Sequence, residues 1–376
     1  MTQPRRLRRS LVLLAALGAL LLVGAWWVNR QLEPRRLTTL VLGKAGTALQ
    51  LKIGFKGEPE YALKPEPRLV IPSLTLAAST GGKPFLTARR VEISLPWATI
   101  TGGEPVITRL QLDAPVLDLA GMRRWIASLP EKPFELPTLT KGLRVSDGTI
   151  IGDGYSISAL QLDVARLKTG EKAEIEASGR FQQGTTRVDF DARLAADTPG
   201  LASDFTLDGS GFLIRKPEPL KFKLQAAGHY ASTDALFSAQ LVRLALSGTA
   251  PLPSLQGKGS LTLGKQMQWA FDGVLASWPK AWPALPKPLD EQTSNLPLHL
   301  AYAGRPDLGD PITLTVDRAP TVLDASLRLA ELNRWLSASN PSPLPPVNGK
   351  FRTPALVFDG VELRGVEVEL SDGPLP

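Results

Sequence analysis

Apolar and polar residues alternate along most of the chain, and this alternation constrains the fold more than any other feature of the sequence. Residues 188–194 read Val-Asp-Phe-Asp-Ala-Arg-Leu, so that every second side chain is apolar. A period of two is that of a β-strand with one apolar and one polar face. Comparable runs occupy Val91–Trp97, Phe222–Ala226, Met267–Phe271, Ile312–Val316 and Val366–Leu370. The pattern predicts a mainly β protein whose sheet has one apolar face.

Turn signals separate the alternating runs. Asp-Gly pairs occur at residues 147–148, 153–154, 208–209, 272–273, 359–360 and 372–373. Because Asp-Gly readily supplies the positive φ angles of tight hairpins, we expect turns at these pairs. The chain also has 33 glycines and 33 prolines, scattered along its length, which is typical of many short strands joined by turns. Strands and turns together predict a long antiparallel meander.

A separate feature is the apolar run Leu11–Val28, eighteen residues without a charge. As a helix with a rise of about 1.5 Å per residue it spans about 27 Å, close to the hydrocarbon thickness of a bilayer. We therefore predict a transmembrane anchor over residues 11–30, preceded by a basic tail over residues 1–10. Its main apolar and aromatic residues are Leu11, Leu14, Leu17, Leu21, Val23, Trp26 and Trp27.

A cleaved signal peptide is the alternative for this segment, since Val23 and Ala25 have the spacing of a cleavage site. The uncleaved anchor is favoured because the run exceeds the usual 7–15 residues of a signal sequence and because paired tryptophans suit a membrane interface. Basic residues flank both ends and nearly balance one another, so the flanking charges alone do not set the orientation. They are Arg5, Arg6, Arg8 and Arg9 before the run, and Arg30, Arg35, Arg36 and Lys44 after it.

Three short stretches have a helical period instead: Leu37–Gly43, Ala120–Leu129 and Leu329–Ser339. Helices this short are not stable alone, so we expect their apolar faces to pack on the sheet. Leu119–Ile126 and Leu329–Leu336 share the pattern Leu-Ala-x-x-x-Arg-Trp followed by Ile or Leu. Each follows a predicted strand and precedes a proline-containing turn. A repeated supersecondary unit is one interpretation, and chance similarity of two amphipathic helices is the other.

The chain after the anchor divides into four predicted segments. They are an N-terminal region (residues 31–130), a β-meander (131–276), a Trp/Pro-rich loop (277–297) and a C-terminal β region with a short helix (298–376). The loop interrupts the strands because proline cannot donate a ladder hydrogen bond. It is interpreted as a connection that covers a sheet edge, with a lid or docking loop as the alternative.

The composition gives little support for catalysis or for metal or nucleic-acid binding. The chain has no cysteine, and its two histidines, His229 and His299, lie seventy residues apart, so we predict no metal and no cofactor. The basic N-terminal tail supplies four units of the net charge of +7. The remaining positive charge is too small to indicate nucleic-acid binding. No nucleophile elbow or phosphate-binding glycine loop occurs, and no carboxylate pair stands out. We therefore expect a protein that is not an enzyme, and keep an envelope hydrolase only as a third hypothesis.

Several segments resemble the AsmA family of bacterial inner-membrane proteins. The best-matching part covers about residues 10–120 and includes the anchor and the helix that follows it. A later run, Leu356–Leu370, resembles the strand repeats of that family. The other matching elements are the strand Leu49–Phe55, the strand–Pro-x-Pro–strand segment Tyr61–Leu69, the run Val91–Pro96, and the Pro-interrupted strand pair Val106–Leu119.

The resemblance implies a twisted antiparallel sheet bent into an elongated half-pipe, a β-taco-like groove with an apolar interior. It also implies a single-pass inner-membrane protein whose bulk lies in the periplasm. The family is associated with outer-membrane assembly and with phospholipid movement between membranes. The implied partners are the inner membrane and a phospholipid or other acyl-chain ligand, with another envelope protein as a further partner.

The physics of a one-sided sheet leads to two main hypotheses. Such a sheet must cover its apolar face, either by holding acyl chains or by packing on a second sheet. The first hypothesis is a lipid-binding or lipid-transfer protein, and the second is a non-enzymatic assembly or scaffold factor with a closed core. For the first, the predicted lining residues are Val91, Ile93, Leu95, Leu110, Leu112, Val188, Phe190, Leu224, Ile312, Leu314, Val366 and Val368.

Overall fold

A computed structural model describes most of the chain from residue 46 onward. The described residues are 46–47, 50–62, 64, 66–97, 107–129, 138–168, 170–214, 218–233, 236–280, 294–337, 346–358 and 360–371. The predicted anchor with its seven named residues, the stretch Leu37–Gly43 and most of the Trp/Pro-rich loop lie outside these ranges. No helix within them is both long and apolar enough to cross a membrane. The chain forms two compact units, Met1–Lys216 with Ala231–Leu236 and Pro217–Tyr230 with Phe237–Pro376.

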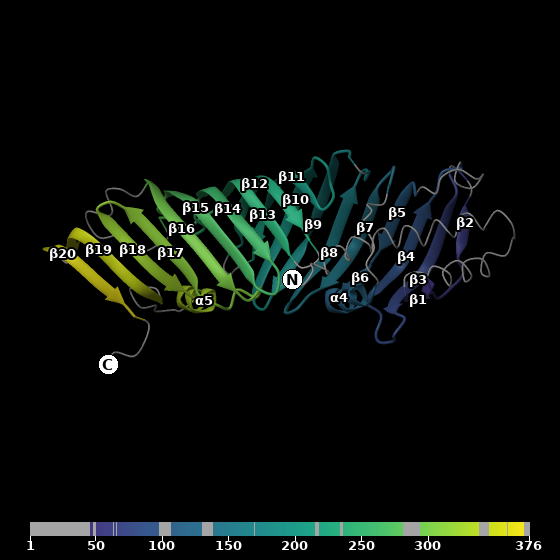
Figure 1. Ribbon diagram of the computed structural model, residues 1–376, viewed down its shortest axis with the longest axis horizontal. Coiled ribbons are helices and arrows are strands. Elements are labelled where there is room, and N and C mark those ends of the chain that lie inside the picture. Colours follow the sequence, from purple (N-terminus) through teal and green to yellow (C-terminus); the bar gives the residue numbers. More distant parts are fainter. Residues whose placement is uncertain are drawn as a thin grey trace, which may run out of the picture. The chain divides into compact units, whose positions relative to one another are not determined.

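Within the described residues, unit 1 contains a sheet of successive strands with one helical crossover (Figure 1). Its strands are β1 (Leu51–Gly54), β2 (Glu60–Ala62), β3 (Arg68–Ala78), β4 (Leu86–Ser94), β5 (Arg109–Asp113), β6 (Val116–Asp118), β7 (Leu143–Ile151), β8 (Tyr155–Val164), β9 (Ala173–Gln183), β10 (Thr186–Ala196) and β11 (Ala202–Leu213). Both β1 and β2 pair with β3, and the order continues through β4, the β5/β6 pair and β7 to β11. All neighbours are antiparallel except β5 and β6 with β7.

Helix α4 (Leu119–Ser128) makes that parallel crossover and closes the core of unit 1. Asp118 caps its first turn by accepting a hydrogen bond from the Ala120 amide at 3.0 Å. Trp125 is 1% exposed and stacks on Phe85 with ring centroids 5.3 Å apart. Around these rings gather apolar side chains from β3, β4, β5 and β7. The core of unit 1 therefore lies under α4, between residues 51 and 164.

A transverse line of left-handed residues crosses the strands that form this core. Ser73, Ala114, Asp147 and Ala159 have φ angles of 48°, 46°, 56° and 51°, and they lie level with one another in the ladders of β3 to β8. A left-handed residue inserted in a strand changes which of the following side chains point inward. On β3, Ile71 and Leu74 are consequently both buried although they are three residues apart. The line keeps the apolar side chains on one face.

The strand boundaries correct part of the turn prediction. Asp153-Gly154 does form the β7–β8 turn, where the Gly152 amide donates to the Tyr155 carbonyl at 2.9 Å, and Gly360 lies between two strands at a φ of 82°. The pairs at 147–148, 208–209 and 272–273 instead lie inside β7, β11 and β15, so a turn there is wrong. Asp tolerates left-handed φ and Gly allows close backbone approach, which strands use as well as hairpins. The pair at 372–373 lies outside the described residues.

Unit 2 is an antiparallel meander in which each strand from β13 onward pairs with the next (Figure 1). Its elements are most of β12 (Leu220–Ser232), then β13 (Phe237–Gly248), β14 (Leu255–Leu263), β15 (Met267–Ser277), β16 (Ser294–Gly304), β17 (Ile312–Arg318), β18 (Thr321–Leu327), α5 (Leu329–Ser337), β19 (Val347–Phe358) and β20 (Val361–Leu370). The mainly β class with an antiparallel sheet and few short helices is therefore confirmed.

Two of the three predicted helices form within the described residues, as α4 and α5, but they do not belong to one repeated unit. The strands on either side of α4 are parallel, whereas β18 and β19, on either side of α5, are antiparallel. A parallel return needs a connection that runs the length of the strands, and an antiparallel return needs only a turn at one end. The shared helix pattern does not specify which return occurs. The chance similarity of two amphipathic helices is the interpretation that the topology supports.

Candidate functional site

Five of the predicted lining residues lie in the closed core of unit 1. Val91, Ile93 and Leu110 are 1% exposed, and Leu95 and Leu112 are 7% exposed. They belong to the same cluster as Trp125 of α4. The prediction that these five line an accessible groove is therefore corrected. They form the interior of unit 1 because α4 and the neighbouring strands cover them.

Beyond the core, unit 1 has an apolar surface that no described helix covers, and we call it the β9–β11 apolar face. Its side chains are partly exposed, and they include the predicted Val188 and Phe190. The ladders place Leu194 opposite both Ile175 and Leu207, and Ala192 opposite Ala177. The residues of this face are Ile175, Ala177, Phe181, Val188, Phe190, Ala192, Leu194, Phe205, Leu207 and Leu213.

Glycines flank one of the three phenylalanines of this face. Phe190 lies opposite Gly179 on β9 and Gly211 on β11. A Cβ placed on Gly179 would lie 3.4 Å from Cζ of the Phe190 ring. A larger residue there would compete with the ring for the same space. Along this cross-strand row, a phenylalanine therefore lies between two glycines, which have no side chain.

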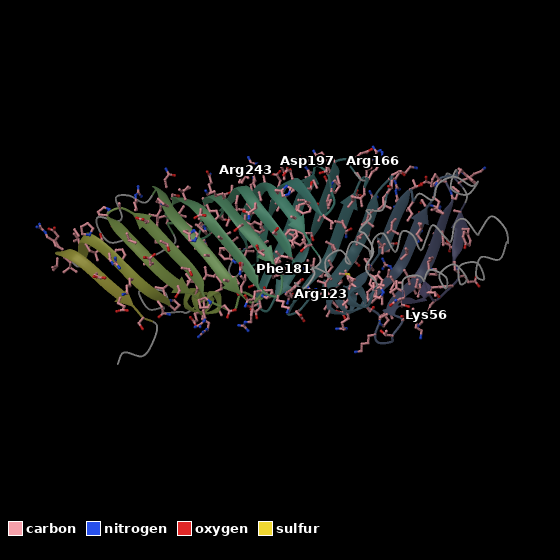
Figure 2. All side chains as sticks on the ribbon, in the orientation of Figure 1. Lys56, Arg123, Arg166, Phe181, Asp197 and Arg243 are labelled. Carbon is pink, nitrogen blue, oxygen red and sulfur yellow. The ribbon has the colours of Figure 1, made fainter. Side chains whose placement is uncertain are left out.

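The opposite side of the same strands carries ion pairs. Arg180 donates from Nε to Asp189 at 2.6 Å, and Arg193 lies 3.1 Å from Glu176. At the β8–β9 connection, Arg166, labelled in Figure 2, lies 3.0 Å from Glu171. Strands β9 to β11 therefore separate a charged side from an apolar side, as the period of two predicts.

The Arg180–Asp189 pair makes a pH-dependent contribution to stability. The hydrogen bond from Arg180 holds the pKa of the Asp189 carboxyl below its usual range. A carboxyl with a depressed folded-state pKa stabilises above its unfolded pKa of about 3.9, and loses that contribution as the pH falls through its folded pKa. We expect the stability difference between wild type and Asp189→Asn to be largest above about pH 4 and to shrink below it. Urea unfolding at stepped pH measures this, and an unchanged difference down to the lowest pH would contradict it.

Unit 2 has a second apolar surface, which we call the β17–β19 apolar face. Its cross-strand rows are Ile312–Leu327–Val347, Leu314–Ala325–Gly349 and Val316–Leu323–Phe351. The predicted Ile312 is 5% exposed, while Leu314 is half-buried in the middle row. On the flanking strands, Leu300 of β16 lies opposite Leu314, and Val368 of β20 lies opposite Phe351. Most of this face, like that of unit 1, is partly exposed.

The remaining predicted residues occupy less protected places. Leu224 on β12 and Val366 on β20 are half-buried, and Val368 is 37% exposed. Sequence reasoning missed the polar residues that end the β17–β19 apolar face, Arg318, Thr321 and Thr353. The available signal was the alternation itself, since Arg318 occupies the position after Ile312, Leu314 and Val316 where the pattern predicts an apolar residue.

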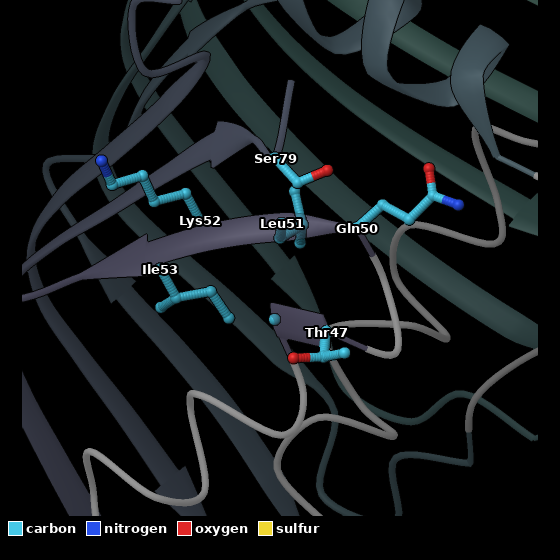
Figure 3. Close-up of a pocket in the computed structure, with 7 residues that line it drawn as sticks. Thr47, Gln50, Leu51, Lys52, Ile53 and Ser79 are labelled. Carbon is cyan, nitrogen blue, oxygen red and sulfur yellow. The ribbon is translucent and has the colours of Figure 1, made fainter. Parts of the chain in front are cut away.

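A small hollow lies beside β1, at the start of the described chain (Figure 3). It has a volume of about 470 Å³ and a mixed lining of Gly46, Thr47, Gln50, Leu51, Lys52, Ile53 and Ser79. The Gln50 carbonyl accepts from the Ser79 amide at 2.9 Å, which ties β1 to the turn after β3. The lining offers neither a carboxylate nor a histidine.

Possible metal ligands do not gather in the part of the chain that the structure describes, where no group of three or more His, Cys, Asp or Glu side chains occurs. His299 pairs with Asp272 across β15 and β16, with 2.5 Å between Nδ1 and Oδ1. Both side chains are about half exposed on the polar side of the strands, which is the setting of a surface pair.

Comparison with protein-family models, with curated proteins and with solved structures found no match for this chain.

Proposed function

We propose that this protein is a membrane-anchored periplasmic protein of a bacterial envelope that binds acyl chains and takes part in phospholipid transfer or outer-membrane biogenesis. The carrying observation is the pair of partly exposed apolar faces, each backed by a polar side of the same strands. Burying a methylene group contributes about 0.8 kcal/mol, so each carbon of an acyl chain that packs on such a face makes the binding free energy more favourable. Lipid transfer requires that the protein bind and release acyl chains, and it does not require a catalytic group. The AsmA-like segments and the Leu11–Val28 run support the placement in the inner membrane.

A non-enzymatic assembly or scaffold factor is the second candidate. The observation that favours it is the closed core of unit 1 between residues 51 and 164, where Trp125 and its neighbours leave the interior filled. A scaffold would use such a rigid body to hold another envelope protein. The two candidates differ in whether acyl chains contact the two apolar faces.

Site-specific photo-crosslinking separates these candidates. A benzophenone side chain at Leu194 or Leu323 is expected to capture phospholipid in cells, because both positions lie on apolar faces and are partly exposed. The same probe at the neighbouring Arg193 or Asp324 tests the polar side of the same strands and is expected to capture none. Mass spectrometry of the adducts provides the measurement. Lipid on neither face would remove the support for the first candidate.

A probe at Ile93 serves as the matched interior control. Ile93 is equally apolar but only 1% exposed, so we expect no lipid adduct there. Capture at Ile93 together with Leu194 would show that the core of unit 1 opens, and would make the closed-core interpretation wrong.

A further inference from the structure

A row of polar side chains ends the β17–β19 apolar face. Arg318 of β17 lies opposite Thr321 of β18, and Thr321 is followed in register by Thr353 of β19. The Oγ1 atoms of Thr321 and Thr353 lie 2.9 Å apart. No left-handed residue interrupts residues 312–318, so Arg318 is on the same side of β17 as Leu314 and Val316. The apolar rows therefore meet a guanidinium and two hydroxyl groups at one end.

This row is more protected than a surface cluster of the same residues would be. Thr353 is 4% exposed, and its hydroxyl donates to the Ala355 carbonyl at 3.2 Å. Arg318 and Thr321 are half-buried. Arg352, the neighbour of Thr353 on the opposite side of β19, is exposed and lies 3.2 Å from Glu367. The strands of this sheet thus present Arg318 of β17 toward the apolar rows and Arg352 of β19 away from them.

The dimensions and charge of this arrangement match an amphiphile. Rows on one side of a strand are about 6.8 Å apart, so the three apolar rows span about 14 Å. The acyl chains of one leaflet extend over about 15 Å, half of a hydrocarbon core of about 30 Å. The guanidinium of Arg318 suits a phosphate oxygen, to which it offers charge-assisted hydrogen bonds.

We propose that Arg318, at the polar end of the β17–β19 apolar face, binds the phosphate of an anionic phospholipid whose acyl chain lies on that face. This inference rests on the proposed function, since it requires that acyl chains reach this face. It adds a headgroup preference and an orientation: the phosphate lies at the Arg318 end, and the acyl chain points toward Leu327, where α5 follows.

The test uses the full chain in vesicles of equal phosphatidylglycerol and phosphatidylcholine, with the benzophenone probe at Leu323. We expect wild type to capture phosphatidylglycerol about tenfold over phosphatidylcholine, in line with hydrogen bonds to a charged group. Arg318→Gln is expected to reduce this ratio to about one while the total captured lipid changes little. Arg318→Lys keeps the charge but loses the planar fork, and is expected to retain part of the preference.

Arg352→Gln is the matched control, because it removes an arginine of the same sheet from the polar side, and its ratio is expected to stay at the wild-type value. Thermal unfolding of each variant checks that the fold persists. A wild-type ratio near one, or an unchanged ratio in Arg318→Gln, overturns the headgroup site and leaves the proposed function standing. Absence of any lipid adduct at Leu323 in wild type overturns both the headgroup site and acyl-chain binding on this face.

Discussion

Replacing Trp125 by alanine is expected to destabilise unit 1 by about 3–5 kcal/mol, the usual range for removing a fully buried tryptophan. Trp125 is 1% exposed and stacks on Phe85, so its loss leaves a cavity between α4 and the sheet. Because the core residues of β4 and β5 face that cavity, their amides should lose protection first. Urea unfolding combined with peptide-resolved hydrogen exchange over residues 86–95 and 107–118 measures both effects.

Trp97 provides the matched control for this substitution. It follows β4 and is 48% exposed, so Trp97→Ala removes the same ring from a solvent-accessible place. We expect a much smaller loss of unfolding free energy for this variant. Equal losses for Trp97→Ala and Trp125→Ala would mean that α4 does not close the core.

Replacing Gly142 by alanine is expected to disrupt the start of β7. A Cβ at this position would lie 1.6 Å from the Val164 carbonyl oxygen, far inside contact distance, and the backbone atom cannot rotate away. Gly142 also has a φ of 77°, which an L-residue adopts at a cost of about 1–2 kcal/mol. The clash adds to this cost, so we expect a total loss of about 3 kcal/mol or more in unfolding free energy.

Gly184 separates the two contributions. It lies in the β9–β10 turn with a φ of 54°, and a Cβ there would meet no atom within 4 Å. Gly184→Ala should therefore cost only the conformational part, about 1–2 kcal/mol. If chemical denaturation gave the same loss for both variants, the close approach of Gly142 to Val164 would not contribute.

Local sequence features predicted the elements that depend on local physics. The period of two identified the strands, as at residues 188–194, and the helical period identified α4 and α5 to within two residues. The turn at Asp153-Gly154 was predictable because its φ requirement is satisfied within the turn itself. Each of these features involves neighbours in sequence.

Other features involve strands that are distant in sequence. The Asp-Gly pairs at 147–148, 208–209 and 272–273 have the same composition as the true turn. They lie within strands instead, because the segments around them pair with neighbouring strands. The same holds for the candidate site. Ile93 and Leu194 occur in similar alternating runs, yet Ile93 is covered by the packing around α4 and Leu194 is partly exposed.

The sequence by itself determined that this protein is mainly β, that its strands have one apolar and one polar side, and where two short helices form. These properties follow from side-chain periodicity, which is set along a single strand or helix. Only the tertiary structure decided which apolar residues are enclosed, which remain accessible, and that Arg318 ends an apolar face. Burial depends on what packs against a residue, and the covering groups, such as Trp125 of α4 over β4, come from distant parts of the chain.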